Sequence, residues 1–298
     1  MRPHYTLRVS NELTRLRLDI AYDGTDFLGW AKQPGLRTVQ GELEAALATV
    51  FRENPPILTV AGRTDAGVHA TGQVAHVDLS AEQLNHLAKP HGRRAKPMEP
   101  TLALRKRLNG IAGLRSDVHV REVSRAPEGF DARFSPTFRR YEYRIADAVA
   151  RRDPLLRRHT VWYPAELDVE AMTVSADELL GLHDWAAYCR PREGATTIRE
   201  LQGFSWRRDE TGVLIATLKA DAFCHSMVRA LVGAAVSVGE RKLSGERLLG
   251  IRDEAQRTSE FKVMPAHGLT LVEVGYPDDV AARAAQTRAR RDADDRLR

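Results

Sequence analysis

The stretch Leu16-Arg17-Leu18-Asp19-Ile20-Ala21-Tyr22 decides the class of fold, because large apolar side chains alternate along it with polar or small ones. A period of two is typical of a β-strand that buries one face. Strands in both halves of the chain are predicted by similar patterns, at 57–61, 75–79, 118–123, 139–145, 203–206, 213–219 and 269–276. The sequence therefore predicts a sheet that draws strands from the whole chain.

Helices are expected between these strands. Thr38 can cap a helix whose apolar face recurs at spacings of three and four, with Val39, Leu43, Ala46, Leu47 and Val50. A second stripe consists of Leu104, Leu108 and Ile111, and later helices are predicted at 168–180 and 226–239. Segment 81–100 contains three prolines, a glycine and four basic residues, so we expect an exposed, mobile excursion there.

This order of elements predicts an α+β fold of two similar lobes, with a central, mostly antiparallel sheet flanked by helices and an active-site cleft between the lobes. The lobes are expected at 16–145 and 146–277. Residues 278–298 are charged and rich in arginine and alanine, which indicates a frayed helix or a tail.

Composition narrows the class of protein. The chain has 298 residues, of which 43% are hydrophobic and 29% charged, so collagen, a disulfide scaffold and wholesale disorder are excluded. It contains no apolar run long enough for a membrane helix and no secretory signal, so we expect a cytoplasmic protein. The chain has only two cysteines, too few for a C-x-x-C zinc or redox motif. We therefore expect Cys189 and Cys224 to be plain buried thiols.

Positive charge is concentrated in a few segments, although the formal net charge is only +5. Any single cluster is explained by a solvated surface, but repeated arginine-rich segments favour a polyanionic partner such as nucleic acid. The clusters are Arg93, Arg94 and Lys96; Arg139 and Arg140; Arg151, Arg152, Arg157 and Arg158; and Arg288, Arg290 and Arg291.

The block Gly62-Arg63-Thr64-Asp65-Ala66-Gly67-Val68-His69-Ala70 is the strongest candidate for chemistry. Glycines on both sides of Asp65 permit positive φ and a close approach of a ligand, so the loop can aim the carboxylate into a cleft. Arg63 could then reach an anionic group. The alternative is a tight turn in which Asp65 only caps backbone N–H groups.

A second candidate is Arg229, which lies in the apolar stretch 223–236. A helix that is apolar on nearly every face is buried, and a guanidinium cannot shed its charge there, so a carboxylate is expected beside it. We predict Asp65 as that partner. The alternatives are a pair with Asp221, or an Arg229 head group that reaches solvent from an exposed edge.

A third candidate is Tyr141, which shares one face of the predicted strand 139–145 with Tyr143 and Ile145. Core packing accounts for most such tyrosine pairs. A ring beside a charged site can instead stack on a base that has left its helix, with the hydroxyl available for proton transfer. No H-x-x-x-H or H-E-x-x-H pair is present, so metal ligation has little support. The sequence also has no glycine motif of the kind that binds nucleotide phosphates.

Eight ordered blocks of the sequence together resemble the bacterial tRNA pseudouridine synthase A family. They are the blocks around Tyr22–Trp30, Thr38–Gly41, Gly62–Ala70, Gly72–Val74, Ala132–Ser135, Arg140–Tyr143, Met227–Gly233 and Pro265–Leu269. The resemblance spans about 17–277, nearly the whole chain. It implies an isomerase that converts uridine to pseudouridine at positions 38, 39 and 40 of the tRNA anticodon stem-loop, without a metal or an organic cofactor.

The resemblance also assigns residues and architecture. It implies that Asp65 is the nucleophile, that Arg63 engages the RNA and the displaced base, that Tyr141 packs against the uracil, and that Arg229 pairs with Asp65. It further implies a homodimer with a basic cleft. Two other classes stay open from the residues: an RNA-binding protein without catalysis, and a hydrolase of nucleosides or phosphoesters, although the phosphoesterase form lacks paired metal-binding carboxylates.

Overall fold

Ten strands form one mostly antiparallel sheet in this computed structural model, which describes residues 13–90, 96–191 and 196–296. The strands are β1 (Thr14–Tyr22), β2 (Thr59–Val60), β3 (His69–Leu79), β4 (Val118–Arg125), β5 (Phe138–Ala146), β6 (Val161–Trp162), β7 (Gly181–Asp184), β8 (Ile198–Arg208), β9 (Leu214–Ala220) and β10 (Leu269–Gly275). Their order is β4-β1-β3-β10-β5-β9-β8-β7, with β2 beside β3 and β6 beside β5. The predicted α+β class is confirmed.

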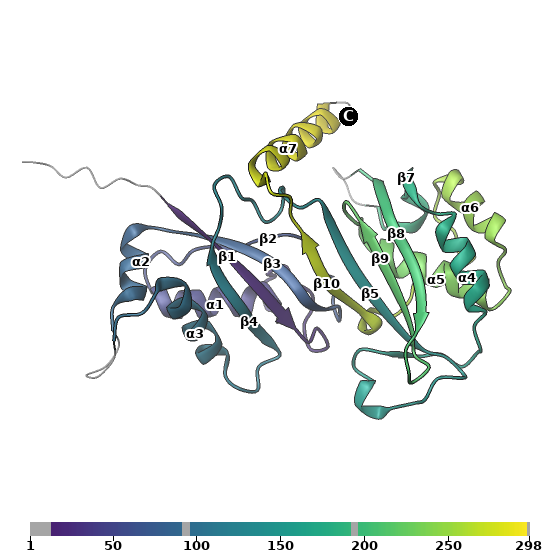
Figure 1. Ribbon diagram of the computed structural model, residues 1–298, viewed down its shortest axis with the longest axis horizontal. Coiled ribbons are helices and arrows are strands. Elements are labelled where there is room, and N and C mark those ends of the chain that lie inside the picture. The colour runs from purple at the N-terminus through teal and green to yellow at the C-terminus, as the bar shows by residue number, and fades with distance from the viewer. Residues whose placement is uncertain (1–12, 91–95, 192–195, 297–298) are drawn as a thin grey trace, which may run out of the picture.

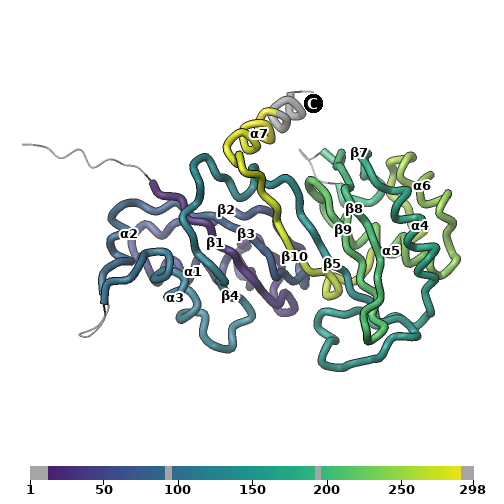
Figure 2. The backbone as a smooth tube through the Cα atoms, in the orientation of Figure 1, coloured from purple at the N-terminus to yellow at the C-terminus, as the bar shows by residue number. Residues whose placement is uncertain are grey.

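The last strand of the chain lies near the centre of the sheet. β10 pairs in parallel with β3 through Thr270 and Leu271, and it runs antiparallel to β5 on its other side. Figure 2 shows this yellow strand between the blue strands of the first half and the teal β5. The two halves of the sequence are therefore joined into one sheet by a strand made at the end of the chain.

The helices gather at the two ends of the sheet (Figure 1). They are α1 (Val39–Phe51), α2 (Ala81–Ala88), α3 (Pro100–Ala112), α4 (Val169–Asp177), α5 (Met227–Gly239), α6 (Gly245–Glu254) and α7 (Val280–Arg296), with short 3-10 turns η1 (Pro154–Leu156), η2 (Ala186–Tyr188) and η3 (Ala266–Gly268). Helices α1 to α3 lie with β1, β3 and β4, α4 to α6 lie with β7 and β8, and α7 projects above the sheet.

The period-two pattern of β1 forms the core as predicted. Leu16, Leu18 and Ile20 are completely buried, and burial of each side chain contributes about 1.5–3 kcal/mol relative to exposure. The predicted cap of α1 is also confirmed, since the Thr38 hydroxyl accepts a hydrogen bond from the Gly41 amide at 3.2 Å. In α5, every residue except Arg229 is buried, as the apolar stretch predicted.

The prediction for 81–100 is wrong in its first part, because residues 81–88 form α2. Ser80 and Gln83 make a reciprocal capping box in which each side chain accepts a hydrogen bond from the other residue's amide. Leu87 anchors the helix in the core. Residues 91–95, with Arg93 and Arg94, lie outside the described residues.

Other sequence predictions need smaller corrections. Ile111 is 45% exposed and does not extend the buried stripe of α3, and Ile57 lies outside the two-residue strand β2. Most of the charged C-terminal segment is the helix α7. The short edge strand β7 and the helix α6 were not predicted.

The two cysteines are not plain thiols. Cys189, at the end of η2, and Cys224, in the turn before α5, are joined as a disulfide with their Cα atoms 5.8 Å apart. Their positions differ by 35 in the sequence. Their pairing depends on how η2 packs beside the start of α5, which no local pattern indicates.

Candidate active site

Asp65 lies on the loop that connects β2 to β3, and hydrogen bonds hold this loop along its length. The hydroxyl of Thr64 pairs with that of Tyr22 at 2.8 Å, and the Thr64 carbonyl accepts from the Trp30 amide at 3.0 Å. The Gly62 carbonyl accepts from the Gln73 side chain at 2.9 Å. Arg139 donates to the Ala61 carbonyl at 2.8 Å. The loop is thus fixed before any ligand binds.

Burial of Tyr22 supports this network. It raises the pKa of the Tyr22 phenol to about 12, so the phenol stays protonated at neutral pH. The hydroxyl therefore serves Thr64 and Gln73 as a neutral group.

A tight turn follows Asp65, closed by a hydrogen bond of 3.2 Å from the Val68 amide to the Asp65 carbonyl. Gly67 has φ of +78°, which glycine adopts without strain, so the predicted conformational role holds for this residue. It does not hold for Gly62, whose φ is not positive. Gly24 packs so closely against the turn that a Cβ there would lie 2.1 Å from the Val68 carbonyl oxygen.

The Asp65 carboxylate faces two cationic or ionisable side chains. Its Oδ2 lies 3.5 Å from Nη1 of Arg229, and its Oδ1 lies 3.4 Å from Nε2 of His225. Asp65 keeps 31% of its side chain exposed, Arg229 21% and His225 40%. No hydrogen bond from the described residues reaches the carboxylate oxygens, so their lone pairs remain accessible to a substrate.

The predicted pair of Asp65 with Arg229 is therefore confirmed. Arg229 lies in the first turn of α5 and not in the middle of a helix, which leaves its head group half-buried. Its Nε donates to the Met264 carbonyl at 2.7 Å. The alternative partner Asp221 instead accepts backbone amides from Glu200 and Ala222.

The sequence reasoning missed His225. A lone histidine among ten has no spacing partner that would mark it. Its position two residues before the start of α5, near the predicted Arg229, was the only available signal. Because the N-terminal end of a helix favours negative charge, the first turn of α5 suits an approaching carboxylate.

Tyr141 places a buried ring on β5 with a hydroxyl that has no hydrogen-bond partner among the described residues. Its ring packs edge-to-face against Phe223, with centroids 5.2 Å apart. Burial raises the pKa of the Tyr141 phenol well above its usual range, and the negative charge of Asp65 adds to this effect. The phenol is therefore neutral and can donate a hydrogen bond.

Arg63 extends from the same loop and is exposed, with no hydrogen bond or ion pair to another described residue. A free guanidinium two residues from the carboxylate can contact a phosphate or a base. The structure thus brings Asp65 and Arg229 together, places Tyr141 within electrostatic reach of Asp65, and leaves Arg63 open to solvent.

His69 ties the far end of the loop to three other segments. The Gly24 amide donates to its Nδ1 at 2.9 Å, so Nε2 carries the ring hydrogen and donates to the carbonyls of Arg158 and His267 at 2.8 and 3.1 Å. This neutral form cannot also donate to the nearby Asp23 carboxylate. Asp23 pairs instead with the Arg158 guanidinium at 3.3 Å.

The basic clusters differ in how much charge they leave free. Arg139 points inward and donates to three carbonyls, Arg140 pairs with Glu273, and Arg288 pairs with Asp131. Residues 151–158, here called the arginine arm, are different. Arg151, Arg152 and Arg157 are exposed and form no ion pair with a described carboxylate, although Arg152 stacks over Trp162.

The arm is anchored to the site as well as to the sheet. The Arg158 carbonyl accepts the hydrogen bond from His69, and the Arg151 amide donates to the Thr211 carbonyl at 2.9 Å in the β8–β9 connection. The charges of Arg151, Arg152 and Arg157, which pair with no described carboxylate, are therefore presented from a segment fixed at both ends, adjacent to the strand that follows the Asp65 loop.

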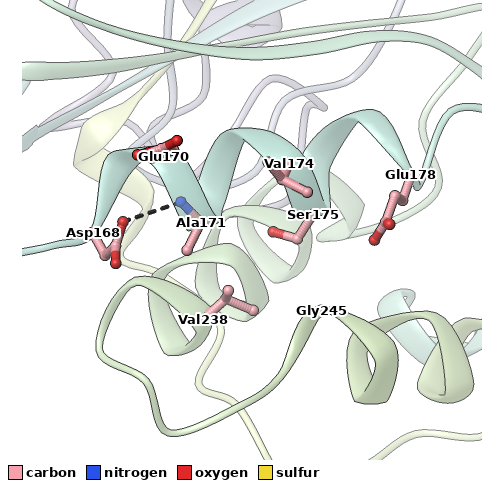
Figure 3. Close-up of a pocket in the computed structure, with 8 residues that line it drawn as sticks. All are labelled: Asp168, Glu170, Ala171, Val174, Ser175, Glu178, Val238 and Gly245. Carbon is pink, nitrogen blue, oxygen red and sulfur yellow. Dashed lines mark hydrogen bonds between the residues drawn. The ribbon is translucent and has the colours of Figure 1, made fainter.

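A separate hollow of about 390 Å³ lies between α4, α5 and α6 (Figure 3). Its lining includes the carboxylates Asp168, Glu170 and Glu178 but none of the residues around Asp65. Asp168 already caps α4 through the Ala171 amide. An acidic lining repels a polyanion, so this hollow does not extend the candidate active site.

The described residues contain no group of three or more His, Cys, Asp or Glu side chains that could hold a metal ion. None of their helices is long and apolar enough to cross a membrane.

The family described as tRNA pseudouridine synthase matches residues 175–277, a span that contains His225 and Arg229. The chain is 64% identical to tRNA pseudouridine synthase A of Leifsonia xyli over 290 residues, which cover 95% of this chain and 99% of that protein.

Other relatives agree. The tRNA pseudouridine synthase A of Frankia casuarinae is 50% identical and that of Streptomyces avermitilis 52% identical, over 94% and 93% of this chain and 97% and 94% of those proteins. The chain belongs to the tRNA pseudouridine synthase A family, whose members are isomerases.

Proposed function

We propose that this protein converts uridine to pseudouridine at positions 38, 39 and 40 of the tRNA anticodon stem-loop, with Asp65 as the nucleophile. Membership of the family supports the reaction and the class of substrate. The arrangement that carries the assignment of Asp65 is its carboxylate on a fixed loop, paired with Arg229 at 3.5 Å and still 31% exposed.

The reaction requires no external electron acceptor. The bond between uracil N1 and ribose C1′ breaks, and a bond between C5 and C1′ forms. C5 loses a proton and N1 gains one, so atoms and charge balance without oxidation or reduction. A metal or an organic cofactor is therefore not needed by the chemistry.

Asp65 can begin this reaction in three ways: by attack on C1′, by attack on C6, or by removal of a ribose proton. Each requires the carboxylate in its ionised form. Arg229 places a positive charge 3.5 Å from Oδ2 of this carboxylate. The accessible lone pairs of Asp65 suit attack on an atom of the substrate.

The neighbouring side chains have separate tasks in this proposal. The uracil packs against Tyr141, whose neutral hydroxyl donates a hydrogen bond to a carbonyl oxygen of the base. Arg63 engages the RNA and helps to keep the base out of its stack. Extrusion of a base costs a few kcal/mol, which contacts to phosphates offset.

The substrate RNA is held by basic side chains. We place the arginine arm against its phosphates, because Arg151, Arg152 and Arg157 have no carboxylate partner in the part of the chain that the structure describes. We further propose, from the family resemblance, that the protein acts in the cytoplasm as a homodimer with two lobes, 16–145 and 146–277, around the cleft. Sedimentation of the purified protein tests the dimer.

The central experiment is Asp65→Asn, assayed on a tRNA transcript with uridines at positions 38, 39 and 40. Pseudouridine formation, measured by chemical labelling, should be abolished, while tRNA affinity stays within about tenfold because phosphate contacts hold the RNA. Asp278→Asn, at an exposed aspartate before α7, is the matched control and should keep full activity.

The outcomes separate the alternatives. Turnover by Asp65→Asn would refute the nucleophile. A wild-type protein that binds tRNA without isomerising uridine would be an RNA-binding protein. Released uracil or cleaved RNA would indicate a hydrolase.

A further inference from the structure

His225 is placed against the carboxylate by a strained turn. Residues Cys224 to Met227 form this turn, which is closed by a hydrogen bond of 3.1 Å from the Met227 amide to the Cys224 carbonyl. Ser226 has φ of +66° and ψ of 3°, a left-handed conformation that a side chain with a Cβ rarely adopts. Such strain tends to cluster at functional sites, because the surrounding structure must hold it in place.

The turn is held from outside. The Arg190 amide donates to the His225 carbonyl at 2.9 Å, and Cys224 is joined to Cys189 of the same segment. The Ser226 hydroxyl does not cap α5, although serine is a favoured cap. The conformation of Ser226 therefore orients the neighbouring His225 and does not cap the start of α5.

We propose that His225 is a positioning residue for the reaction: it holds Oδ1 of Asp65 while Arg229 holds Oδ2, so that the carboxylate keeps one orientation toward the substrate. This proposal rests on Asp65 as the nucleophile. A single cation would leave the carboxylate free to rotate about its terminal torsion, which is broad. Two nitrogens, one near each oxygen at 3.4 and 3.5 Å, restrict that rotation.

Other side chains near Asp65 do not duplicate this contact. Tyr141 affects Asp65 electrostatically but forms no hydrogen bond with it in the described structure, and Arg63 is directed to solvent. Arg229 and His225 are the only two basic side chains among the described residues with a nitrogen within 4.0 Å of the Asp65 carboxylate oxygens.

The test compares His225→Ala with His225→Gln in steady-state assays, with single-turnover assays to isolate the chemical step. Loss of the ring should lower kcat by about tenfold to a hundredfold, since misplaced reacting groups cost rates of this order, and it should leave KM for tRNA nearly unchanged. Gln retains an N–H donor near the position of Nε2 and should restore most of the rate. His119→Ala, at an exposed histidine on β4, is the matched control.

A second substrate separates positioning from proton transfer. In RNA with 5-fluorouridine at the target, C5 has no proton to lose, so the reaction reports the steps before that loss. A residue that positions Asp65 should slow consumption of uridine and of 5-fluorouridine equally. Slowing of uridine alone would mean that His225 accepts the C5 proton, and it would overturn the proposal.

The role of Asp65 as nucleophile and the role of His225 in positioning it can be refuted separately. If Asp65→Asn is inactive and His225→Ala retains the wild-type kcat, only the positioning role is refuted. If Asp65→Asn is active, the proposed nucleophile is refuted as well. A lower melting temperature of His225→Ala with an unchanged kcat would show a structural role only, and it would likewise overturn the proposal.

Discussion

Arg229 and Met264 are joined twice: Nε of Arg229 donates to the Met264 carbonyl at 2.7 Å, and the Met264 amide donates to the Arg229 carbonyl at 3.1 Å. The segment before η3 thereby fixes both the backbone and the head group of this arginine. Only the outer nitrogens of the guanidinium remain to face Asp65, and Nη1 does so.

Arg229→Lys should therefore lower activity even though it keeps the charge. A single ammonium cannot donate to the Met264 carbonyl and face Asp65 with the same geometry. We expect kcat to fall by about tenfold or more, which corresponds to roughly 1.4 kcal/mol of transition-state stabilisation. Single-turnover kinetics measure the effect, and an unchanged kcat would contradict it.

Arg229→Ala should also destabilise the fold, but less than removal of a fully buried partner. Because both members of the pair are partly exposed, we expect a loss of about 1–2 kcal/mol in the free energy of unfolding. Urea denaturation tests this value. A loss above about 3 kcal/mol would mean that the pair is more strongly desolvated than its exposure indicates.

The arginine arm should contribute to RNA binding and not to the chemical step. For the double variant Arg151→Glu with Arg152→Glu, KM for tRNA should rise at least about tenfold with kcat preserved. The slope of log affinity against log salt should become shallower by about 1.5. Arg257→Glu, at an exposed arginine after α6, is the control for reversal of a surface charge outside the arm, and it changes the net charge by half as much as the double variant.

Ser226 offers a test of the strained turn. Ser226→Gly removes a conformational cost of about 1 kcal/mol, which the greater chain entropy of glycine partly offsets, so the variant should be as stable as the wild type or slightly more stable and fully active. Ser226→Val should lower both the melting temperature and kcat, because a β-branched side chain resists positive φ. Equal melting temperatures and equal kcat values for the two variants would contradict backbone strain at Ser226.

His76 should make the fold sensitive to acid. Burial lowers the pKa of this side chain to about 4, and its Nδ1 accepts the Ala132 amide at 3.0 Å. The unfolded chain takes up a proton near pH 6.5 and the folded chain only near pH 4, so stability is complete above pH 6.5 and falls as pH decreases through this window. The full loss is about 3 kcal/mol.

His76→Gln, which cannot protonate, should flatten this part of the profile. The free energy of unfolding, measured in urea between pH 7 and pH 4, should fall less steeply in the variant. The same slope in both proteins would show that other groups dominate acid unfolding.

The sequence predicted best those features that depend on a local period or on a strong physical cost. The alternation in β1 and β5 predicted their buried faces. The free-energy cost of burying an unpaired guanidinium predicted a carboxylate beside Arg229, and Asp65 was the expected partner. Helix α2 was missed because it buries only Leu87, although Ser80 and Gln83 carried a capping signal.

The remaining features depend on contacts between distant segments. The positions of His225 and of the disulfide follow from how η2 packs beside the start of α5, and β7 is an edge strand of four residues with little periodicity. The inward direction of Arg139 could not be predicted either, because its three carbonyl partners come from three separate parts of the chain.

The central place of β10 has a consequence for synthesis. Because residues 269–275 are synthesised after all the other described strands, β3 and β5 have no partner between them until this segment has been made. Met264, which orients Arg229, also belongs to this late segment. A chain that lacks residues 264–275 therefore cannot hold Arg229 through Met264 or join the two halves of the sheet.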